Sequence, residues 1–119
     1  MDGEISAAEL ADLIDANADV RVVDIRSPAA FARGHIPDSV NIPFAELPQR
    51  VEELTGAERI VTVCPHGQAS VQAARLVGSY QGSTGRVESL AEGIEGWRAG
   101  DHAWESEAAP TDEGPDAPF

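Results

Sequence analysis

Short runs of strand-forming residues alternate with amphipathic segments along this chain, and that alternation limits its fold more than any other feature. The clearest run, 60–63, reads Ile-Val-Thr-Val and is typical of a strand that is covered on both faces of a sheet. Similar runs lie at 20–25 and 86–90, and a brief one lies at 40–42. Strands that alternate with helices predict an α/β domain with a mainly parallel sheet and helices on both faces.

Helix signals lie between these runs. Ser6 and Glu9 have the spacing of a capping box, and Leu10, Leu13 and Ile14 follow at helical spacing. We predict helices over 7–17, 46–54, 69–80 and 93–98, and a short helix that starts at Ser27 and Pro28 and stops at Gly34. The helix over 46–54 has Pro48 in its opening turn and is followed by Gly56, which terminates it.

The chain has 119 residues, which is enough for one domain with a modest core. We predict a folded domain over 1–104. Residues 105–119 contain five acids, three prolines and no base, a composition that predicts a disordered tail. The first residues are acidic and no apolar stretch approaches the length of a membrane span, so neither a signal peptide nor a membrane span is expected.

The charge balance is strongly acidic, with 21 acidic residues against 8 basic ones and a net charge of −13, and every base is an arginine. Such a surface repels phosphates, so we expect no nucleic acid and no membrane as partner. An acidic chain without lysine is typical of salt-rich cytoplasms, where high ionic strength screens self-repulsion, and we expect a halophilic source; an ordinary acidic protein is the alternative. The single cysteine, Cys64, cannot form an internal disulfide, which favours a cytoplasmic location.

Cys64 follows the run at 60–63 and opens a short loop before the predicted helix at 69–80. The thiol therefore lies at the carboxyl end of a strand and at the positive end of a helix, where a thiolate is favoured. A dithiol oxidoreductase needs a second cysteine at the position of Gly67. A cysteine phosphatase or arsenate reductase needs an arginine that closes the loop, but those positions hold Ala and Ser, and Arg75 lies about two turns into the helix.

Sulfur transfer through a persulfide fits this loop better than either alternative. A thiolate attacks the outer sulfur of a donor and holds it as Cys–S–S⁻, so the site must keep Cys64 ionised and offer hydrogen-bond donors to an anion. Gly67 permits a tight turn with converging backbone N–H groups, and the Ser70 hydroxyl adds a donor or caps the helix. The three histidines and Cys64 show no zinc-type spacing, so we expect no metal and no other cofactor.

At these residues the chain resembles the rhodanese family of sulfurtransferases, over about 5–101. The resemblance rests on four segments in the family's order: Asp24-Ile25-Arg26 after a strand, Gly34-His35-Ile36-Pro37, the loop Cys64-Pro65-His66-Gly67-Gln68-Ala69-Ser70, and Gly93 to Trp97, with Glu92 in place of the family's first glycine. It implies a five-stranded, mostly parallel sheet with Cys64 as the catalytic nucleophile. It also implies that the persulfide is bound by Pro65, His66, Gly67, Gln68, Ala69 and Ser70.

Three residues outside the loop are predicted to support it. We interpret Asp24 and Arg26 as a structural pair that fixes the segment after the strand, with a catalytic pair as the alternative. We interpret His35 as a structural hydrogen-bonding residue in a tight turn. His66 either donates to the persulfide or is a solvated loop histidine, and both interpretations stay open. Trp97 is predicted to be part of the core.

The loop departs from the family pattern at Pro65 and Ala69, positions that are often basic in members that use thiosulfate. Without those cations an acidic protein captures a dianion poorly, so we expect thiosulfate to be a weak donor and polysulfide or a protein persulfide to load Cys64. The expected partners are therefore a small sulfur donor and acceptor or a sulfur-relay protein. We expect a monomer, with a dimer as the alternative. The second functional hypothesis is a non-catalytic binding or regulatory module with the rhodanese fold and an idle cysteine.

Overall fold

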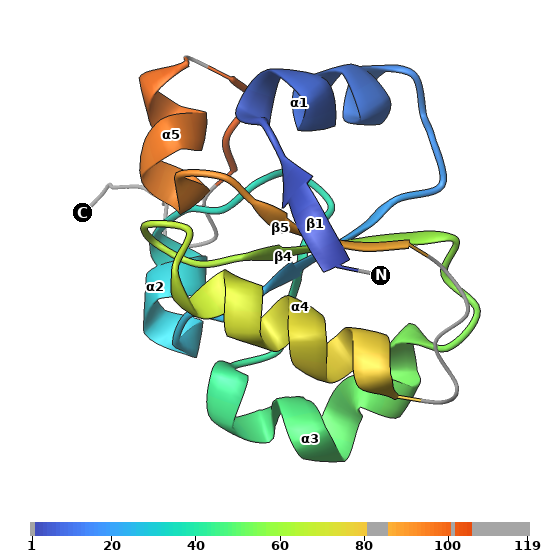
Figure 1. Cartoon of the computed structure of the whole chain (residues 1–119). Helices are drawn as coiled ribbons and strands as arrows, with labels where there is room; N and C mark the ends of the chain where they lie inside the picture. The colour runs from blue at the N-terminus through green and yellow to red at the C-terminus, as the bar shows by residue number, and fades with distance from the viewer. Residues whose placement is uncertain (1, 81–85, 101, 106–119) are drawn as a thin grey trace.

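The computed structural model describes residues 2–80, 86–100 and 102–105. Its centre is a five-stranded sheet in the order β1-β5-β4-β2-β3, in which every neighbouring pair is parallel (Figure 1). This confirms the predicted parallel α/β architecture. The carboxyl ends of all the strands therefore lie along one edge of the sheet. The strands are β1 (Asp2–Ile5), β2 (Arg21–Asp24), β3 (Val40–Asn41), β4 (Arg59–Val63) and β5 (Arg86–Leu90).

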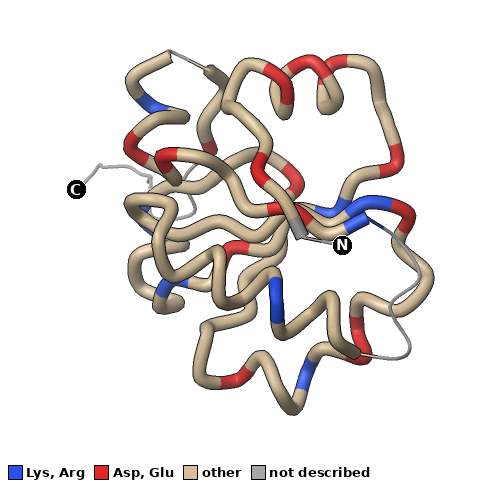
Figure 2. Tube along the Cα trace, viewed as in Figure 1, with Lys and Arg blue, Asp and Glu red and all other residues tan. Residues whose placement is uncertain are grey.

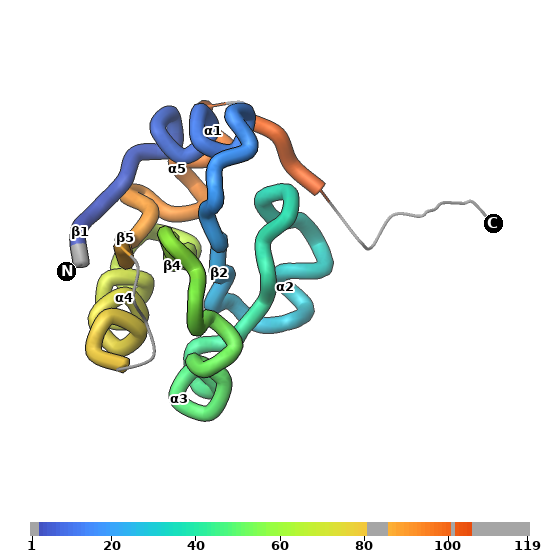
Figure 3. Tube along the Cα trace, turned by 90° about the vertical axis from the view of Figure 1, so that its right-hand side faces the viewer, coloured from blue at the N-terminus to red at the C-terminus, as the bar shows by residue number. Residues whose placement is uncertain are grey.

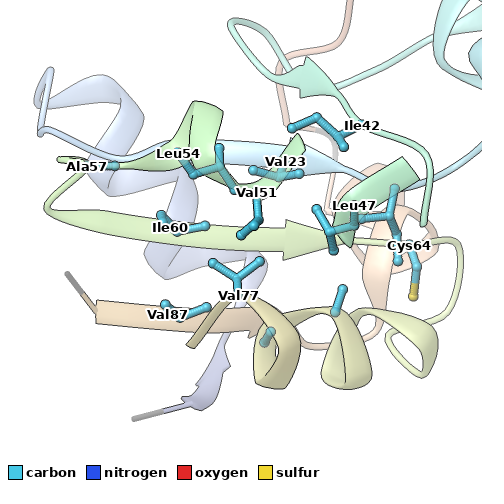
Figure 4. Close-up of a cluster of buried hydrophobic side chains, with 13 residues drawn as sticks. Val23, Ile42, Leu47, Val51, Leu54, Ala57, Ile60, Cys64, Val77 and Val87 are labelled. Carbon is cyan, nitrogen blue, oxygen red and sulfur yellow. The ribbon is translucent and has the colours of Figure 1, made fainter. Parts of the chain in front are cut away.

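Helices cover both faces of the sheet. One face carries α1 (Ala7–Asp15) and α5 (Gly93–Ala99), and the other carries α3 (Leu47–Arg50) and α4 (Ala69–Ser79), while α2 (Pro28–Arg33) lies beside β2 (Figure 3). Each face has its own cluster of buried apolar side chains. Trp97 belongs to the cluster under α1 and α5 and is 1% exposed, which confirms its predicted core position. Cys64 belongs to the other cluster and lies at its end (Figure 4).

Several helix boundaries follow from the predicted caps. The Ser6 hydroxyl accepts from the Glu9 N–H at 3.1 Å, and the Glu9 carboxylate accepts from the Ser6 N–H at 3.2 Å, so the capping box at α1 is present. α1 ends at Asp15, two residues earlier than predicted, and Asn17 already has a left-handed φ of 56°. α2 begins after Ser27 and ends before Gly34, as predicted.

The segment predicted as a helix over 46–54 is helical, but it is divided into three short pieces. Pro48 has no N–H with which to bond the Phe44 carbonyl, and that carbonyl instead accepts from the Leu47 N–H with 3₁₀ geometry. The apolar side chains of the segment still reach the core, because the short pieces keep a helical direction. These pieces are η1 (Phe44–Glu46), α3 and η2 (Val51–Leu54).

β1 has no counterpart among the strands predicted from hydrophobic runs. Three of its four residues are Asp2, Gly3 and Glu4, which are uncommon in strands, and Ile5 supplies its buried side chain. Parallel pairing with β5 adds β1 to the edge of the sheet. Together the strands make up the number that the family resemblance implies.

The last described residue, Glu105, pairs with His35 next to α2. The His35 N–H donates to the Glu105 carbonyl at 2.8 Å, and the Glu105 N–H donates to the His35 carbonyl at 2.9 Å. The rest of the predicted tail lies outside the described residues. Within the part of the chain that is described, no helix is long and apolar enough to cross a membrane. Acidic residues are spread over both helical layers, with fewer basic residues among them (Figure 2).

Candidate active site

Cys64 directly follows β4, the central strand, and opens the loop that leads into α4. β4 pairs with β5 on one side and with β2 on the other. Cys64 therefore lies at the carboxyl edge of a parallel sheet, where ligand sites of open α/β sheets form. The residue is only 2% exposed, and its sulfur lies at the end of the apolar cluster (Figure 4).

Hydrogen-bond donors converge on the Cys64 sulfur. The Gly67 N–H donates to Sγ at 3.1 Å and the Ser70 N–H donates to it at 3.3 Å. Ser70 Oγ lies 3.4 Å from Sγ. All of these groups are neutral and belong to the loop or the first turn of α4, so dipoles rather than a cation stabilise a negative sulfur here.

Two opposing effects set the pKa of the Cys64 thiol. Burial is the largest effect and raises the pKa, because a buried site disfavours the charged form. The Ser70 hydroxyl and the backbone N–H groups of Ser70, His66 and Gly67 lower the pKa, and together they outweigh burial. The pKa of Cys64 therefore lies below its ordinary value. At neutral pH more of this cysteine is thiolate, the nucleophilic form, than of a free cysteine.

Two glycines let the loop and the start of α5 approach each other closely. Gly67 has a φ of 84°, and a Cβ on it would lie 2.7 Å from the backbone nitrogen of Glu92. Gly93 has a φ of 60°, and a Cβ on it would overlap the Cys64 carbonyl oxygen. Both positions combine a left-handed backbone with no room for a side chain, so the geometry of the donors depends on these glycines.

The first turn of α5 also holds the loop by hydrogen bonds. The Ile94 N–H donates to the Cys64 carbonyl at 2.8 Å, and the Glu95 N–H donates to the Pro65 carbonyl at 3.1 Å. Pro65 thus contributes its carbonyl to the loop, although it has no N–H to offer the sulfur.

The other loop side chains face outward or pack below the site. Pro65, His66 and Gln68 are exposed, whereas Ala69 packs against the apolar cluster that includes Cys64. His66 Nδ1 lies 3.3 Å from a carboxylate oxygen of Glu95, and the two side chains are 62% and 72% exposed. Of the two interpretations of His66, this position at the rim fits the solvated histidine better.

Asp24 and Arg26 form a tight pair after β2. Arg26 donates through Nη2 to Asp24 Oδ2 at 2.7 Å and through Nε to Oδ1 at 2.9 Å, and Asp24 is 1% exposed. The same Nη2 donates to the Gly34 carbonyl at 2.7 Å, and the Asn41 amide donates to the carbonyls of Asp24 and Arg26. These contacts tie β2 to α2 and β3, as expected of a structural pair.

His35 is 4% exposed and packs under the carboxyl-terminal segment. Its ring stacks on Phe31 with the centroids 3.9 Å apart, and Nδ1 lies 2.7 Å from the Phe31 carbonyl oxygen. Nε2 lies 3.7 Å from a carboxylate oxygen of Glu105. His35 therefore joins α2 to the segment at 102–105, which fits the structural interpretation.

Two residues near the loop are missing from the residues predicted to form the site. Ser89 on β5 is 1% exposed, and its Oγ lies 2.6 Å from Ser70 Oγ. Glu92 has a left-handed φ of 63°, and a Cβ on Gly96 would lie 2.6 Å from the Glu92 Cβ, so a small residue at 96 makes room for Glu92. The signals available in the sequence were a serine inside a buried strand and a glutamate where the family has glycine.

The geometry does not favour the phosphatase hypothesis. Arg75 lines a hollow over β1 with Gly3 and Glu4 and does not close the loop around Cys64. Among the described residues there is no group of three or more histidine, cysteine, aspartate or glutamate side chains that would hold a metal ion.

Comparisons with known proteins agree with this arrangement. The sequence profile of the rhodanese-like domain family matches residues 6–100. A protein of Allochromatium vinosum named sulfurtransferase is 36% identical over 97 residues, which cover 82% of this chain and 89% of that protein. The thiosulfate sulfurtransferase GlpE of Pseudomonas syringae is 41% identical over 78 residues, which cover 65% of this chain and 71% of that protein.

The fold is similar to a solved member as well. The crystal structure of a rhodanese-related protein from Thermoplasma volcanium matches with a TM-score of 0.73 and 27% identity, over 86% of this chain and 96% of that one. The family match spans most of the chain and includes the loop at Cys64. The chain therefore belongs to the rhodanese-like domain family.

Proposed function

We propose that this protein is a sulfurtransferase that carries sulfane sulfur as a persulfide on Cys64. The observation that carries the proposal is the convergence of Gly67 N–H, Ser70 N–H and Ser70 Oγ on Cys64 Sγ within 3.4 Å. Such a cradle favours a thiolate as attacking group, and the names of the relatives in the family support the same reaction class.

The reaction needs no redox partner. The Cys64 thiolate attacks the outer sulfur of a donor R–S–S⁻, a new S–S bond forms, the donor's S–S bond breaks, and R–S⁻ leaves. The product is Cys64–S–S⁻. A thiophilic acceptor such as cyanide then takes the outer sulfur as thiocyanate, and the thiolate returns.

The surroundings of the sulfur favour a polysulfide or a protein persulfide over thiosulfate as the donor. Thiosulfate is a dianion, and the loop offers it no cation at Pro65 or Ala69. The exposed carboxylates of Glu92 and Glu95 lie beside the loop, and a carboxylate oxygen of Glu95 lies 3.3 Å from His66 Nδ1. The persulfide of a relay protein, R–S–S⁻, or a hydropolysulfide, HSn⁻, carries one negative charge fewer than thiosulfate and meets less repulsion at this rim.

The test is intact-protein mass spectrometry after incubation with polysulfide. We expect the chain to gain the mass of one sulfur atom and to lose it again on addition of cyanide, with thiocyanate as product. Since Cys64 is the only cysteine, the Cys64→Ser variant must show no adduct. Ser79→Ala, a change at the exposed end of α4, is the matched control and should load fully.

The same measurement separates the alternative of a non-catalytic module. The loss of both cationic loop positions is the feature that favours that alternative. A folded wild-type chain that takes up no sulfur from polysulfide or from a loaded cysteine desulfurase would support the module and contradict the enzyme.

A further inference from the structure

The Ser70 hydroxyl has one proton and two close partners. Its Oγ lies 3.4 Å from Cys64 Sγ on one side and 2.6 Å from Ser89 Oγ on the other. All three residues are at most 2% exposed, so water does not readily replace a missing hydrogen bond. The direction in which each hydroxyl donates must therefore match the charge on the sulfur.

Two arrangements of the protons satisfy this chain. With a neutral thiol, Cys64 S–H donates to Ser70 Oγ, and Ser70 O–H donates to Ser89 Oγ. With a thiolate, Ser89 O–H donates to Ser70 Oγ, and Ser70 O–H donates to the sulfur. No proton is gained or lost by the two hydroxyls in the change, because each one only rotates. The thiolate arrangement requires Ser89 to act as a donor.

We propose that Ser89 is a positioning residue whose hydroxyl donates to Ser70 Oγ and thereby directs the Ser70 proton at the anionic Cys64 sulfur. Ser89 lies on β5, opposite Thr62 of β4 in the parallel register, so the rigid sheet fixes its position. A hydroxyl that accepts a hydrogen bond is a better donor, and the effect is stronger where the final acceptor is charged. The inference rests on the proposed use of a Cys64 anion in catalysis.

The Ser70 backbone is held separately from its hydroxyl. Thr62 Oγ1 donates to the Ser70 carbonyl at 2.7 Å and lies 3.3 Å from the Glu88 carbonyl oxygen. The first turn of α4 is thus tied to the sheet without Ser89. This separation makes it possible to remove the Ser89 hydroxyl and leave the N–H donors of the loop in place.

Charged groups on the surrounding elements stay unchanged in the variants that test this proposal. His66 is in the loop, Glu92 and Glu95 lie at the start of α5, and the Asp24–Arg26 pair follows β2. Their contribution to the pKa of Cys64 is common to all variants. A difference between variants then reports the hydroxyl chain.

The experiment is a double-mutant cycle that reads the pKa of Cys64 from the pH dependence of its alkylation by iodoacetamide. In the full chain with Ser70 present, Ser89→Ala should leave about threefold less thiolate at a pH below the pKa, and Ser70→Ala about tenfold less. In the Ser70→Ala background, Ser89→Ala should have no effect, because the hydroxyl that it directs is absent. Ser89→Thr keeps a hydroxyl and should restore the wild-type profile.

Several outcomes would overturn the proposal. An equal shift from Ser89→Ala in both backgrounds would mean that Ser89 acts through packing. An unchanged or lowered pKa in Ser89→Ala would mean that its hydroxyl does not donate toward the sulfur. If Ser89→Ala does not fold, the isosteric variants Ser89→Thr and Ser89→Val take its place. A higher pKa of Cys64 in Ser89→Val than in Ser89→Thr with Ser70 present, and no difference in the Ser70→Ala background, supports the chain, whereas an equal difference in both backgrounds contradicts it. Alkylation uses no sulfur donor, so these results stand even if the persulfide test fails.

Discussion

Asp24 ends β2 and Cys64 directly follows the adjacent parallel strand β4, and the fold holds these two buried acidic groups in opposite ways. Asp24 is 1% exposed, and the Arg26 guanidinium approaches it to 2.7 Å. Cys64 is 2% exposed and is surrounded by neutral N–H and O–H donors. The carboxylate is matched by a cation, whereas the donors that the structure describes around the thiol are all neutral.

Under the proposed function, the difference separates a structural carboxylate from a reactive thiolate. A guanidinium that bonds both carboxylate oxygens fixes Asp24 and occupies its lone pairs. Neutral donors lower the pKa of Cys64 but leave the charge of the sulfur uncancelled, so a thiolate can still attack. The donors to Asp24 come largely from one side chain, whereas those to Cys64 come largely from the backbone.

The largest change in the free energy of unfolding is expected when the ion pair between Asp24 and Arg26 is broken. Asp24→Asn keeps the shape of the side chain but leaves the Arg26 guanidinium, whose side chain is 11% exposed, without its counter-charge. We expect the free energy of unfolding to fall by about 3 kcal/mol. Urea unfolding followed by circular dichroism measures this change.

The matched control is Glu53→Gln, which breaks an exposed ion pair with Arg50 of similar geometry. Water and salt screen that pair, so the free energy of unfolding should change far less than in Asp24→Asn. Equal losses in the two variants would contradict the structural role of Asp24.

Around Cys64 the donors belong to the backbone, so the variant that disturbs them changes the backbone of the loop. Gly67→Ala adds a Cβ at a φ of 84°, only 2.7 Å from the Glu92 nitrogen, so the loop must shift. We expect a loss of about 2 kcal/mol in the free energy of unfolding, together with a raised pKa of Cys64, because the shifted N–H groups no longer meet the sulfur. Unfolding curves and the pH dependence of alkylation measure the two effects.

Gly78→Ala is the matched control on α4, where a Cβ meets no atom within 4 Å. It should raise the free energy of unfolding by about 0.5–1 kcal/mol and leave the alkylation profile unchanged. A Gly67→Ala variant that keeps the wild-type alkylation profile would show that the cradle does not depend on this turn.

The contrast between side-chain and backbone donors also explains how far the sequence could predict the molecule. The runs at 60–63 and 86–90, the capping box at Ser6 and the stop at Gly34 are local signals, and each appears where it was predicted. β1 carries no such signal, because Asp2, Gly3 and Glu4 join the sheet only through pairing with β5.

The site follows the same division. Cys64, Gly67 and the resemblance to the family indicate the position of the loop from sequence alone, and its chemistry stays a proposal. The contact between Ser70 and Ser89 could not be predicted, because it joins α4 to β5 across 19 positions of the chain and depends on strand order. Hydrogen bonds between backbone groups of the loop and α5 carry no residue-specific signal except the glycines that permit them.

A cation added to the loop should give Cys64 the kind of neighbouring positive charge that Asp24 has in Arg26. Pro65→Arg places a guanidinium at an exposed position of the loop and leaves the carbonyl that accepts from Glu95 in place. We expect the KM for thiosulfate to fall about fivefold, which corresponds to roughly 1 kcal/mol between solvent-exposed charges about 4 Å apart. The thiosulfate:cyanide assay measures this KM.

Gln72→Arg is the matched control, because it adds the same charge at an exposed position farther along α4, and it should lower the KM for thiosulfate less. Equal effects would mean that only the net charge matters, and a low KM in the wild type would contradict the donor preference proposed here.

The smallest expected effect is the contribution of the thiolate to stability. The pKa of Cys64 in the folded chain is lowered, so the unfolded chain binds more protons at this group between the two pKa values. The contribution of Cys64 is therefore fully present above the unfolded pKa and is lost as the pH falls through the folded pKa. The measurement compares the free energy of unfolding of the wild type with that of Cys64→Ser at each pH, so that the contributions of the other titrating groups cancel. The difference in favour of the wild type should grow as the pH rises from the folded to the unfolded pKa of Cys64. Burial opposes the donors, which keeps the rise small. A difference that falls with pH would mean that burial outweighs the donors at the sulfur, and Cys64 would then be the more weakly stabilised anion of the two.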